Sequence, residues 1–191
     1  ESAQANGNYF EWNYYVFFAI AFYTGMRKGE IHGLRWSDID GKYISVKRSI
    51  SQKVKGDDRI TPPKNKSSIR TLQIPKPLIE ILNEHKERCK IFDGFSEENY
   101  ICGANKPLRD STIQKRNIKF AQLAGIKTIR IHDFRHSHAS LLANEGINIQ
   151  EVARRLGHSD VEMTWNTYSH LYPREEERAV AVLDEIILKL E

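Results

Sequence analysis

Three histidines and an arginine crowd one short stretch of the chain, "IHDFRHSHAS" (131–140). On a helix, His132 and Arg135 are three residues apart and share a face, and His136 lies four residues from His132. A metal site would need Asp, Glu or Cys at ligand spacing, and the permanent charge of Arg repels a cation. No metal site is therefore expected. An Arg beside a His suits an oxyanion, because Arg offers a planar fork of donors and His a further donor or a titratable proton.

Charge is distributed unevenly along the 191-residue chain, whose formal net charge is +4. Ten basic and two acidic residues fall between Lys42 and Pro77, which gives a local charge of +8. From Arg174 to the end, three basic residues face six acidic ones, which gives −3. A polyanion would be attracted to the first region and repelled by the second, which indicates a nucleic-acid partner. The alternative is that these charges only keep an exposed face solvated.

The elements that must position these residues are predicted to be mostly helices. A first helix is expected from about Tyr9 to Thr24, stopped by Gly25, and a second begins near Arg27. The apolar run in the first helix, "YYVFFAIAFYTG" (14–25), is shorter than the roughly 18 residues that suggest a membrane span. We therefore expect a buried helix of a globular domain.

Two segments alternate apolar and polar residues as strands do. They are "KYISVKRSISQKV" (42–54) and "IRTLQIP" (69–75), and a polar loop over 55–68 is expected to join them. "NYICG" (99–103) is a candidate for one more short strand. Together with the helices, these segments predict a mainly α fold with a small antiparallel β-sheet, of the α+β class.

Later helices are marked by the residues at their ends. Pro75 and Pro77 open one helix, and Asp110 or Ser111 is expected to cap another that ends before Gly125. These signals predict two helices between the strands and the histidine-rich segment.

Two more helices are predicted to meet at "LGHS" (156–159). Asn148, with a Glu three residues later, starts the first of them, and Gly157 is placed to end it. Ser159, again with a Glu three residues later, starts the second. His158 therefore lies at a joint between helices, a position that suits contact with something outside the fold.

The segment "EERAVAVLDEIILKLE" (176–191) is predicted to form a tail helix. Its apolar stripe consists of Val180, Leu183, Ile187 and Leu190. Such a stripe needs an apolar groove, on its own domain or on a neighbouring copy. We therefore divide the chain into a domain over 1–173 and a tail helix over 174–191.

Four segments carry most of the residues suited to chemistry: "TGMRKGEIHGLRWSDI" (24–39), "PPKNKSSIRTLQIP" (62–75), "IHDFRHSHAS" (131–140) and "LGHSDVEMTWNTYSHL" (156–171). In this order they resemble the catalytic domain of the tyrosine recombinases, the phage-integrase family. The resemblance covers about residues 10–172 and is closest to integrases of conjugative transposons and temperate phages. It implies the catalytic-domain fold of that family.

The resemblance implies a catalytic role for six side chains: Arg27, Lys64, His132, Arg135, His158 and Tyr168. Tyr168 would be the nucleophile that forms a covalent 3′-phosphotyrosine, and Lys64 would protonate the departing 5′-oxygen. Arg27, Arg135 and His158 would bind the nonbridging oxygens of the phosphate. His132 would assist proton transfer or positioning, and Glu30 would support Arg27. No cofactor is needed for this chemistry.

Some of these assignments have competitors in the sequence. Lys66 competes with Lys64 for the role of proton donor, and Tyr172 competes with Tyr168 for that of nucleophile. His136 and His138 are expected to pack the helix or to touch the DNA backbone rather than act in the chemistry. The residues expected to contact DNA are Lys66, Arg70, His136 and Arg35.

The predicted function is site-specific recombination at double-stranded DNA attachment sites, for the integration or excision of a mobile element. Two alternatives stay open. A type IB topoisomerase uses the same chemistry to relax DNA, and a DNA-binding regulator would bind without cutting. Formation of a covalent protein–DNA adduct would separate an enzyme from a regulator.

The resemblance also predicts partners beyond DNA. Family members usually carry a smaller helical DNA-binding domain before this one, and this sequence begins without a Met, so we expect such a domain in the whole protein. The tail resembles a segment that family members exchange between protomers, which predicts dimers or tetramers on DNA. Cys89 and Cys102 fit no CxxC pattern, which favours free thiols and a cytoplasmic location with no membrane partner.

Overall fold

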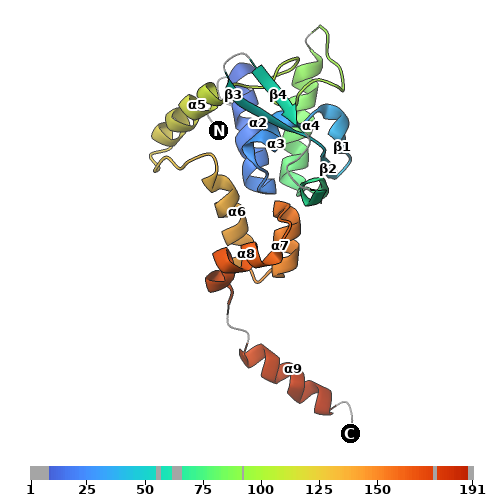
Figure 1. Cartoon of the computed structure of the whole chain (residues 1–191), viewed down its shortest axis with the longest axis vertical. Helices are drawn as coiled ribbons and strands as arrows, with labels where there is room; N and C mark the ends of the chain where they lie inside the picture. Colours follow the sequence, from blue (N-terminus) through green and yellow to red (C-terminus); the bar gives the residue numbers. More distant parts are fainter. Residues whose placement is uncertain (1–8, 55–56, 62–65, 92, 174–175, 189–191) are drawn as a thin grey trace.

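Helices dominate the fold, as the sequence predicted (Figure 1). The computed structural model describes residues 9–54, 57–61, 66–91, 93–173 and 176–188. Its α-helices are α2 (Tyr9–Thr24), α3 (Lys28–Gly33), α4 (Lys76–Lys90), α5 (Asp110–Leu123), α6 (Asp133–Asn144), α7 (Ile149–Leu156), α8 (Val161–Tyr168) and α9 (Glu176–Leu188). Its strands are β1 (Ile39–Asp40), β2 (Tyr43–Val46), β3 (Ser49–Val54), β4 (Asp57–Thr61) and β5 (Arg70–Gln73). Three short 3-10 turns are η1 (Trp36–Asp38), η2 (Lys66–Ser68) and η3 (Ser169–Leu171).

Helix α2 lies at the centre of the main hydrophobic core and contacts α3, α4 and α6. Trp12, Val16, Phe17 and Ile20 are all fully buried, and each contributes about 1.5–3 kcal/mol through the burial of its side chain. Gly25 follows the helix with φ +62°, a left-handed conformation that ends a helix and favours glycine. The bounds predicted for this helix are confirmed.

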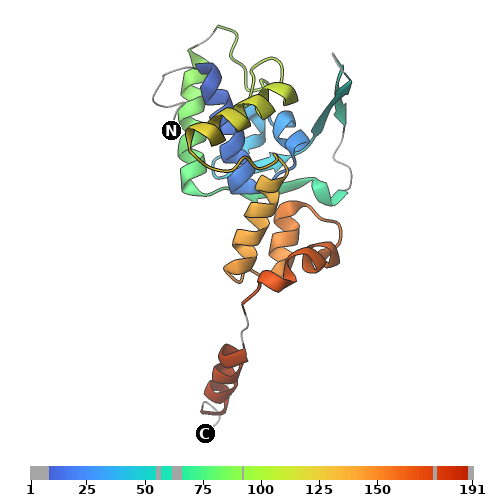
Figure 2. The ribbon, with the colours of Figure 1, turned by 90° about the vertical axis from the view of Figure 1, so that its left-hand side faces the viewer.

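The strands form two small antiparallel sheets. One has the order β1-β2-β5, with Ile44 opposite Leu72 and both side chains buried. The other is a hairpin of β3 and β4, with Ile50 opposite Ile60. In Figure 2 this hairpin projects from the body, and α3 packs against β3.

The predicted loop over 55–68 is wrong in part, because it contains β4. The segment "DDRIT" has little strand character of its own, and its pairing with β3 decides its conformation. The single strand predicted over 42–54 is also split into β2 and β3. Arg48 lies at the break, where its guanidinium binds Asp38 and the carbonyl of Gly33.

The hairpin is tied to the start of α5 through Gln52. Its side-chain nitrogen donates to Leu108 O at 3.1 Å, and its oxygen accepts from Asp110 N at 3.0 Å. The N-cap of α5 is Arg109 and no side chain caps the helix, so the cap predicted at Asp110 or Ser111 is wrong. The Asp110 carboxylate instead binds helix α3, where it pairs with Lys28 and accepts from His32 Nε2 at 2.8 Å.

The strand predicted over 99–103 is also wrong. Tyr100 forms only isolated bridges, with Arg35 and with Ala104. Gly103 has φ +130° and Ala104 has φ +77°, and two left-handed residues in succession turn the chain back before a strand can extend.

Helices α6, α7 and α8 pack around a second apolar cluster: Ala139, Ala143, Val152, Leu156 and Tyr168. Asn148 caps α7 as predicted, because its side chain accepts from Gln150 N at 2.8 Å. The cap of α8 is Asp160 and not the predicted Ser159, since Asp160 accepts from Glu162 N at 2.9 Å. Contacts of α6 with α2 and of α7 with β5 connect this cluster to the main body.

The tail forms the predicted helix, α9, and stands apart from the body in both views (Figures 1 and 2). Val180 and Leu183 of the predicted stripe are exposed, and so is Val182. Leu190 and the side chain of Ile187 lie outside the described part of the structure. No described helix combines the length and apolar character needed to cross a membrane.

Candidate active site

Arg27 precedes α3 and connects that helix to the joint between α7 and α8. Its backbone N donates to Glu30 Oε2 at 2.9 Å and its Nη1 donates to Glu30 Oε1 at 3.0 Å. Its Nη2 donates to Gly157 O at 3.4 Å. The Arg27 side chain is 40% exposed, so the guanidinium is fixed on one side and open to a ligand on the other.

Glu30 binds a second guanidinium as well, that of Arg70. Arg70 Nη2 donates to Glu30 Oε2 at 2.9 Å, and Arg70 Nε donates to Arg155 O at 2.7 Å. Burial alone would raise the pKa of Glu30, but the hydrogen bonds and charges of Arg70 and Arg27 outweigh it and lower that pKa. Glu30 therefore stays ionised and orients both arginines.

Arg135 lies in the first turn of α6 and is 4% exposed. Its Nη1 donates to Gly25 O at 2.8 Å, while its Nη2 is buried and has no hydrogen-bond partner in the described part of the structure. Burial and the nearby positive charge of Arg27 lower the pKa of Arg135 to about 9. A buried cation with an unpaired donor favours an anionic ligand at this point.

His158 lies in the joint after Gly157, as the sequence predicted. Its Nδ1 is 2.7 Å from Thr164 Oγ1, a hydrogen bond that fixes the ring against α8. Burial and the charges of Arg135 and Arg27 lower its pKa to about 4, so the ring is neutral at pH 7. The same interactions place His158 within electrostatic range of both arginines.

Tyr168 is the last residue of α8, and its ring is held in the second apolar cluster. Its hydroxyl lies 2.6 Å from His136 Nδ1. Burial raises the pKa of Tyr168, and the positive charge of Arg135 acts in the opposite direction. The phenol is therefore protonated at neutral pH and lies within electrostatic range of Arg135.

His132 immediately precedes α6, and its ring meets the ring of His136 edge to face at a centroid distance of 5.0 Å. Burial and the charges of His136 and Arg135 lower the pKa of His132. The two histidines form one edge of the site, next to the tyrosine.

Five further candidates from the sequence lie elsewhere in the fold or outside the described residues. Lys64 lies outside the described residues, and Lys66 begins η2 with its side chain outside them. Arg35 binds Glu98 at 2.6 Å. Tyr172, the competitor for the nucleophile, donates to Ile147 O at 2.8 Å. Arg70, predicted to contact DNA, is placed in the interior beside Glu30.

Two contacts of this site were not predicted from the sequence: Glu30 with Arg70, and His136 with Tyr168. They join residues 40 and 32 positions apart, and no spacing within one helix could indicate them. Among the described residues, no group of three or more His, Cys, Asp or Glu side chains is placed to hold a metal ion. The side chains gathered here can bind an oxyanion beside a phenol.

Comparison with known proteins gives the family of this chain. Residues 3–175 match the phage integrase family. The chain is 36% identical over 180 residues to the ICEBs1 integrase of Bacillus subtilis, covering 90% of this chain and 49% of that protein. It is 33% identical over 193 residues to a XerC-like tyrosine recombinase of Caldanaerobacter subterraneus, again covering 90% and 49%. The chain thus spans about half the length of these curated relatives.

Solved structures show the same fold. The Tn1549 transposon integrase in complex with a circular intermediate DNA superimposes with a TM-score of 0.71 at 22% identity, over 90% of this chain and 58% of that one. The catalytic domain of the bacteriophage HP1 integrase superimposes with a TM-score of 0.55 at 22% identity, over 87% and 79%. The predicted fold class is confirmed. The chain belongs to the phage integrase family, the tyrosine recombinases.

Proposed function

We propose that this chain is the catalytic part of a site-specific recombinase that integrates or excises a mobile element. The observation that carries the proposal is the buried guanidinium of Arg135, whose Nη2 has no partner in the described structure. Arg27 and His158 interact electrostatically with Arg135, and so does Tyr168. The positive charges of Arg27 and Arg135 next to one phenol support the binding and attack of a DNA phosphate.

The proposed reaction is a transesterification without a metal ion. Arg27, Arg135 and His158 hold the nonbridging oxygens while Tyr168 Oη attacks phosphorus. The product is a 3′-phosphotyrosyl bond and a free 5′-hydroxyl. The covalent bond retains the energy needed for rejoining, so the reaction consumes no nucleotide cofactor. Removal of one donor to the oxyanion typically costs about 3 kcal/mol in the barrier.

Two of the six proposed residues act on protons. We assign the protonation of the 5′-oxygen to Lys64, with Lys66 as the competitor, and positioning or proton transfer to His132. The hairpin of β3 and β4 precedes the segment that carries both lysines, and Gln52 ties this hairpin to α5. That tie supports a fixed position of the hairpin relative to α5.

DNA attachment sites are the proposed partners of the whole protein. The local charge of +8 between residues 42 and 77 supports phosphate contacts there. Lys66 and Arg35 stay candidates for such contacts, and Arg70 acts through Glu30. An N-terminal DNA-binding domain and a cytoplasmic location belong to the same proposal. Cys89 and Cys102 are both buried, and their spacing fits no CxxC pattern, which supports a reducing compartment.

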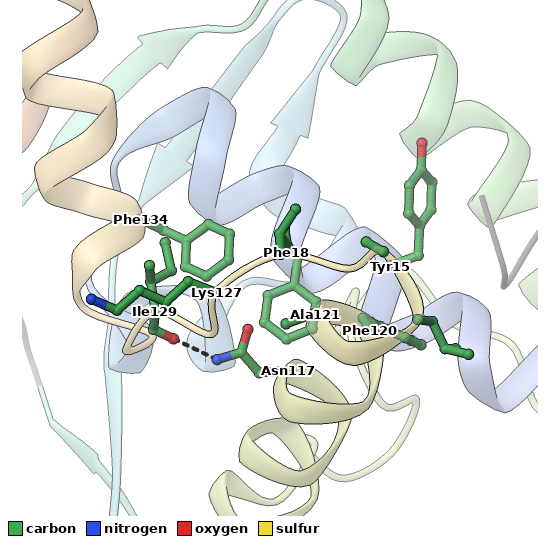
Figure 3. Close-up of a pocket in the computed structure, with 11 residues that line it drawn as sticks. Tyr15, Phe18, Asn117, Phe120, Ala121, Lys127, Ile129 and Phe134 are labelled. Carbon is green, nitrogen blue, oxygen red and sulfur yellow. Dashed lines mark hydrogen bonds between the residues drawn. The ribbon is translucent and has the colours of Figure 1, made fainter.

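We propose that the tail helix α9 docks on a second copy of the chain, which couples assembly to the active site. An apolar cavity of about 600 Å³ between α2, α5 and the segment before α6 offers a groove for it (Figure 3). Phe18 and Phe134 stack within it, and Phe134 is the direct neighbour of Arg135. Lys127 lines the cavity while the tail carries −3, so the charges are complementary. In Figures 1 and 2 the chain's own α9 lies at the end opposite α5, which favours a tail from another copy.

The test uses nicked duplex oligonucleotides of randomised sequence. Cleavage next to the nick releases a short fragment that carries the free 5′-hydroxyl, so the cleaved strand cannot be rejoined. DNA that stays attached to protein after denaturation is isolated and sequenced, which also identifies the preferred site. Plasmids with one or two copies of that site then distinguish the activities. Joining of two sites supports a recombinase, and relaxation without joining supports a topoisomerase. Salt-sensitive binding without any adduct supports a regulator.

A further inference from the structure

His136 and Tyr168 come from different helices and meet at their polar atoms. His136 lies in α6, directly after Arg135, and Tyr168 ends α8. The Nδ1 atom of His136 is 2.6 Å from Tyr168 Oη, which is a short, direct hydrogen bond. The reacting oxygen of the proposed nucleophile therefore already contacts an imidazole before DNA is bound.

We infer that His136 is a catalytic residue that accepts the phenolic proton of Tyr168 during DNA cleavage and returns it during rejoining. This inference rests on the proposed function, because it assigns a partner to the proposed nucleophile. This catalytic role differs from the two roles expected from the sequence, which were packing of the helix and contact with the DNA backbone.

The chemistry of the tyrosine requires such an acceptor. Burial raises the pKa of Tyr168, so the phenol carries its proton at neutral pH and is a poor nucleophile in that form. A base within hydrogen-bond reach removes this obstacle as the bond to phosphorus forms. Since the phenol is the donor, Nδ1 of His136 accepts, and the ring is then the tautomer that carries its proton on Nε2.

The neighbouring histidines are less suited to this role. His138 Nδ1 is bonded to Phe22 O at 2.9 Å, and its Nε2 is buried. His132 meets His136 ring to ring, and the structure gives it no hydrogen bond to Tyr168. His136 is also exposed at the surface of α6, so its protonated ring can be solvated.

The proton balance of the step is complete. A lone pair of Tyr168 Oη forms the bond to phosphorus, and the phenolic proton moves to His136 Nδ1. The bond between phosphorus and the 5′-oxygen breaks, its electron pair stays on that oxygen, and a proton donor such as Lys64 protonates it. In rejoining, the 5′-hydroxyl attacks phosphorus and gives its proton back to the group that donated it in cleavage. The phosphotyrosyl bond breaks with its electron pair on Tyr168 Oη, and the imidazolium returns its proton to that oxygen.

The experiment measures the rate of adduct formation by the full chain on the DNA site recovered from the randomised pool. The variants are His136→Ala and His136→Asn, because an Asn amide can replace the hydrogen bond at Nδ1 but cannot take up a proton. His170→Ala is the matched control, an exposed histidine two residues after the tyrosine. Far-ultraviolet circular dichroism and thermal melting verify that every variant folds.

Loss of a proton acceptor slows cleavage by about a hundredfold or more. We expect that loss in both His136 variants and an unchanged rate in His170→Ala. A bridging 5′-phosphorothiolate substrate, whose leaving group needs no proton, should leave the loss in place, because the affected proton is that of the nucleophile.

Three results would overturn the inference. If His136→Ala formed the adduct as fast as wild type or faster, the hydrogen bond between His136 and Tyr168 would only hold the tyrosine in place before DNA binds. Recovery in His136→Asn would show that a hydrogen bond without proton transfer is enough. Recovery of His136→Ala on the phosphorothiolate would place the lost proton at the leaving group. Failure of the proposed function is recognised separately, since wild type would then form no adduct at all.

Discussion

Glu30 and Arg70 form a buried ion pair at the base of the site, with Nη2 of Arg70 2.9 Å from Oε2 of Glu30. The same carboxylate holds Arg27, and Arg70 also donates to Arg155 O in α7. The Arg70 guanidinium of β5 thus connects α3 with α7. The open guanidinium of Arg27 depends on this connection for its direction.

Glu30→Gln should therefore destabilise the protein strongly. The substitution leaves Arg70 buried without its counter-charge, which typically costs about 3–5 kcal/mol. Urea unfolding measures the free energy. Glu151→Gln is the control, because Glu151 pairs with Arg154 at the surface and such pairs contribute about 1 kcal/mol or less. If the two variants lost the same free energy of unfolding, the Glu30 ion pair would stabilise the protein no more than a surface pair does.

Gly157→Ala should also destabilise, for two separable reasons. Gly157 has φ +68°, which disfavours any side chain, and a Cβ there would lie 2.8 Å from Arg70 Nη1. Gly125 has φ +65° after α5, with nothing within 4 Å of its Cβ position. Gly125→Ala should lose about 1 kcal/mol from backbone strain alone. Gly157→Ala should lose more stability than Gly125→Ala and should also slow cleavage. Equal losses of stability in the two variants would show that Arg70 moves aside freely.

Stability should fall as pH drops from about 6.5 to about 4. Burial and the charge of Arg155 lower the pKa of His138 from 6.5 to about 4, so within this window the unfolded chain binds a proton that the folded chain does not. The contribution of this residue is on the order of 3 kcal/mol across the window. The stability of His138→Gln should depend less on pH than that of wild type in urea unfolding from pH 7 to pH 4. Parallel curves would contradict this assignment.

Leu183→Asp should weaken self-association on DNA, because Leu183 belongs to the exposed apolar stripe of α9. Sedimentation velocity with the recovered DNA site should show fewer complexes above one protomer per half-site. Ile91→Asp is the control, an exposed apolar residue at the end of α4. If both Leu183→Asp and Ile91→Asp gave the same distribution of complexes as wild type, the tail helix would not be the contact between protomers.

The sequence predicted those parts of the fold that local signals determine. The helix over 9–24 was predictable because one apolar run ends at a glycine. Strand β4 was not, because "DDRIT" becomes a strand only by pairing with β3. The cap of α5 was misplaced because the Asp110 carboxylate binds Lys28 and His32, which lie far away in sequence.

The candidate site divides in the same way. The motif resemblance named Arg27, Arg135, His158 and Tyr168 as candidates, but the hydrogen-bond partner of each side chain depends on packing between helices. The contact of His136 with Tyr168 exists only because α6 and α8 share an apolar cluster. A pattern within either helix contains no information about that distance.

The most direct test of the central claim is to map the covalent link to DNA. Protein-linked DNA from wild type is digested with protease, and the phosphorylated peptide is sequenced by mass spectrometry. We expect a 3′-phosphotyrosyl bond at Tyr168 that is lost in Tyr168→Phe and retained in Tyr172→Phe. An adduct that survives Tyr168→Phe, or DNA joining by wild type without any adduct, would contradict it.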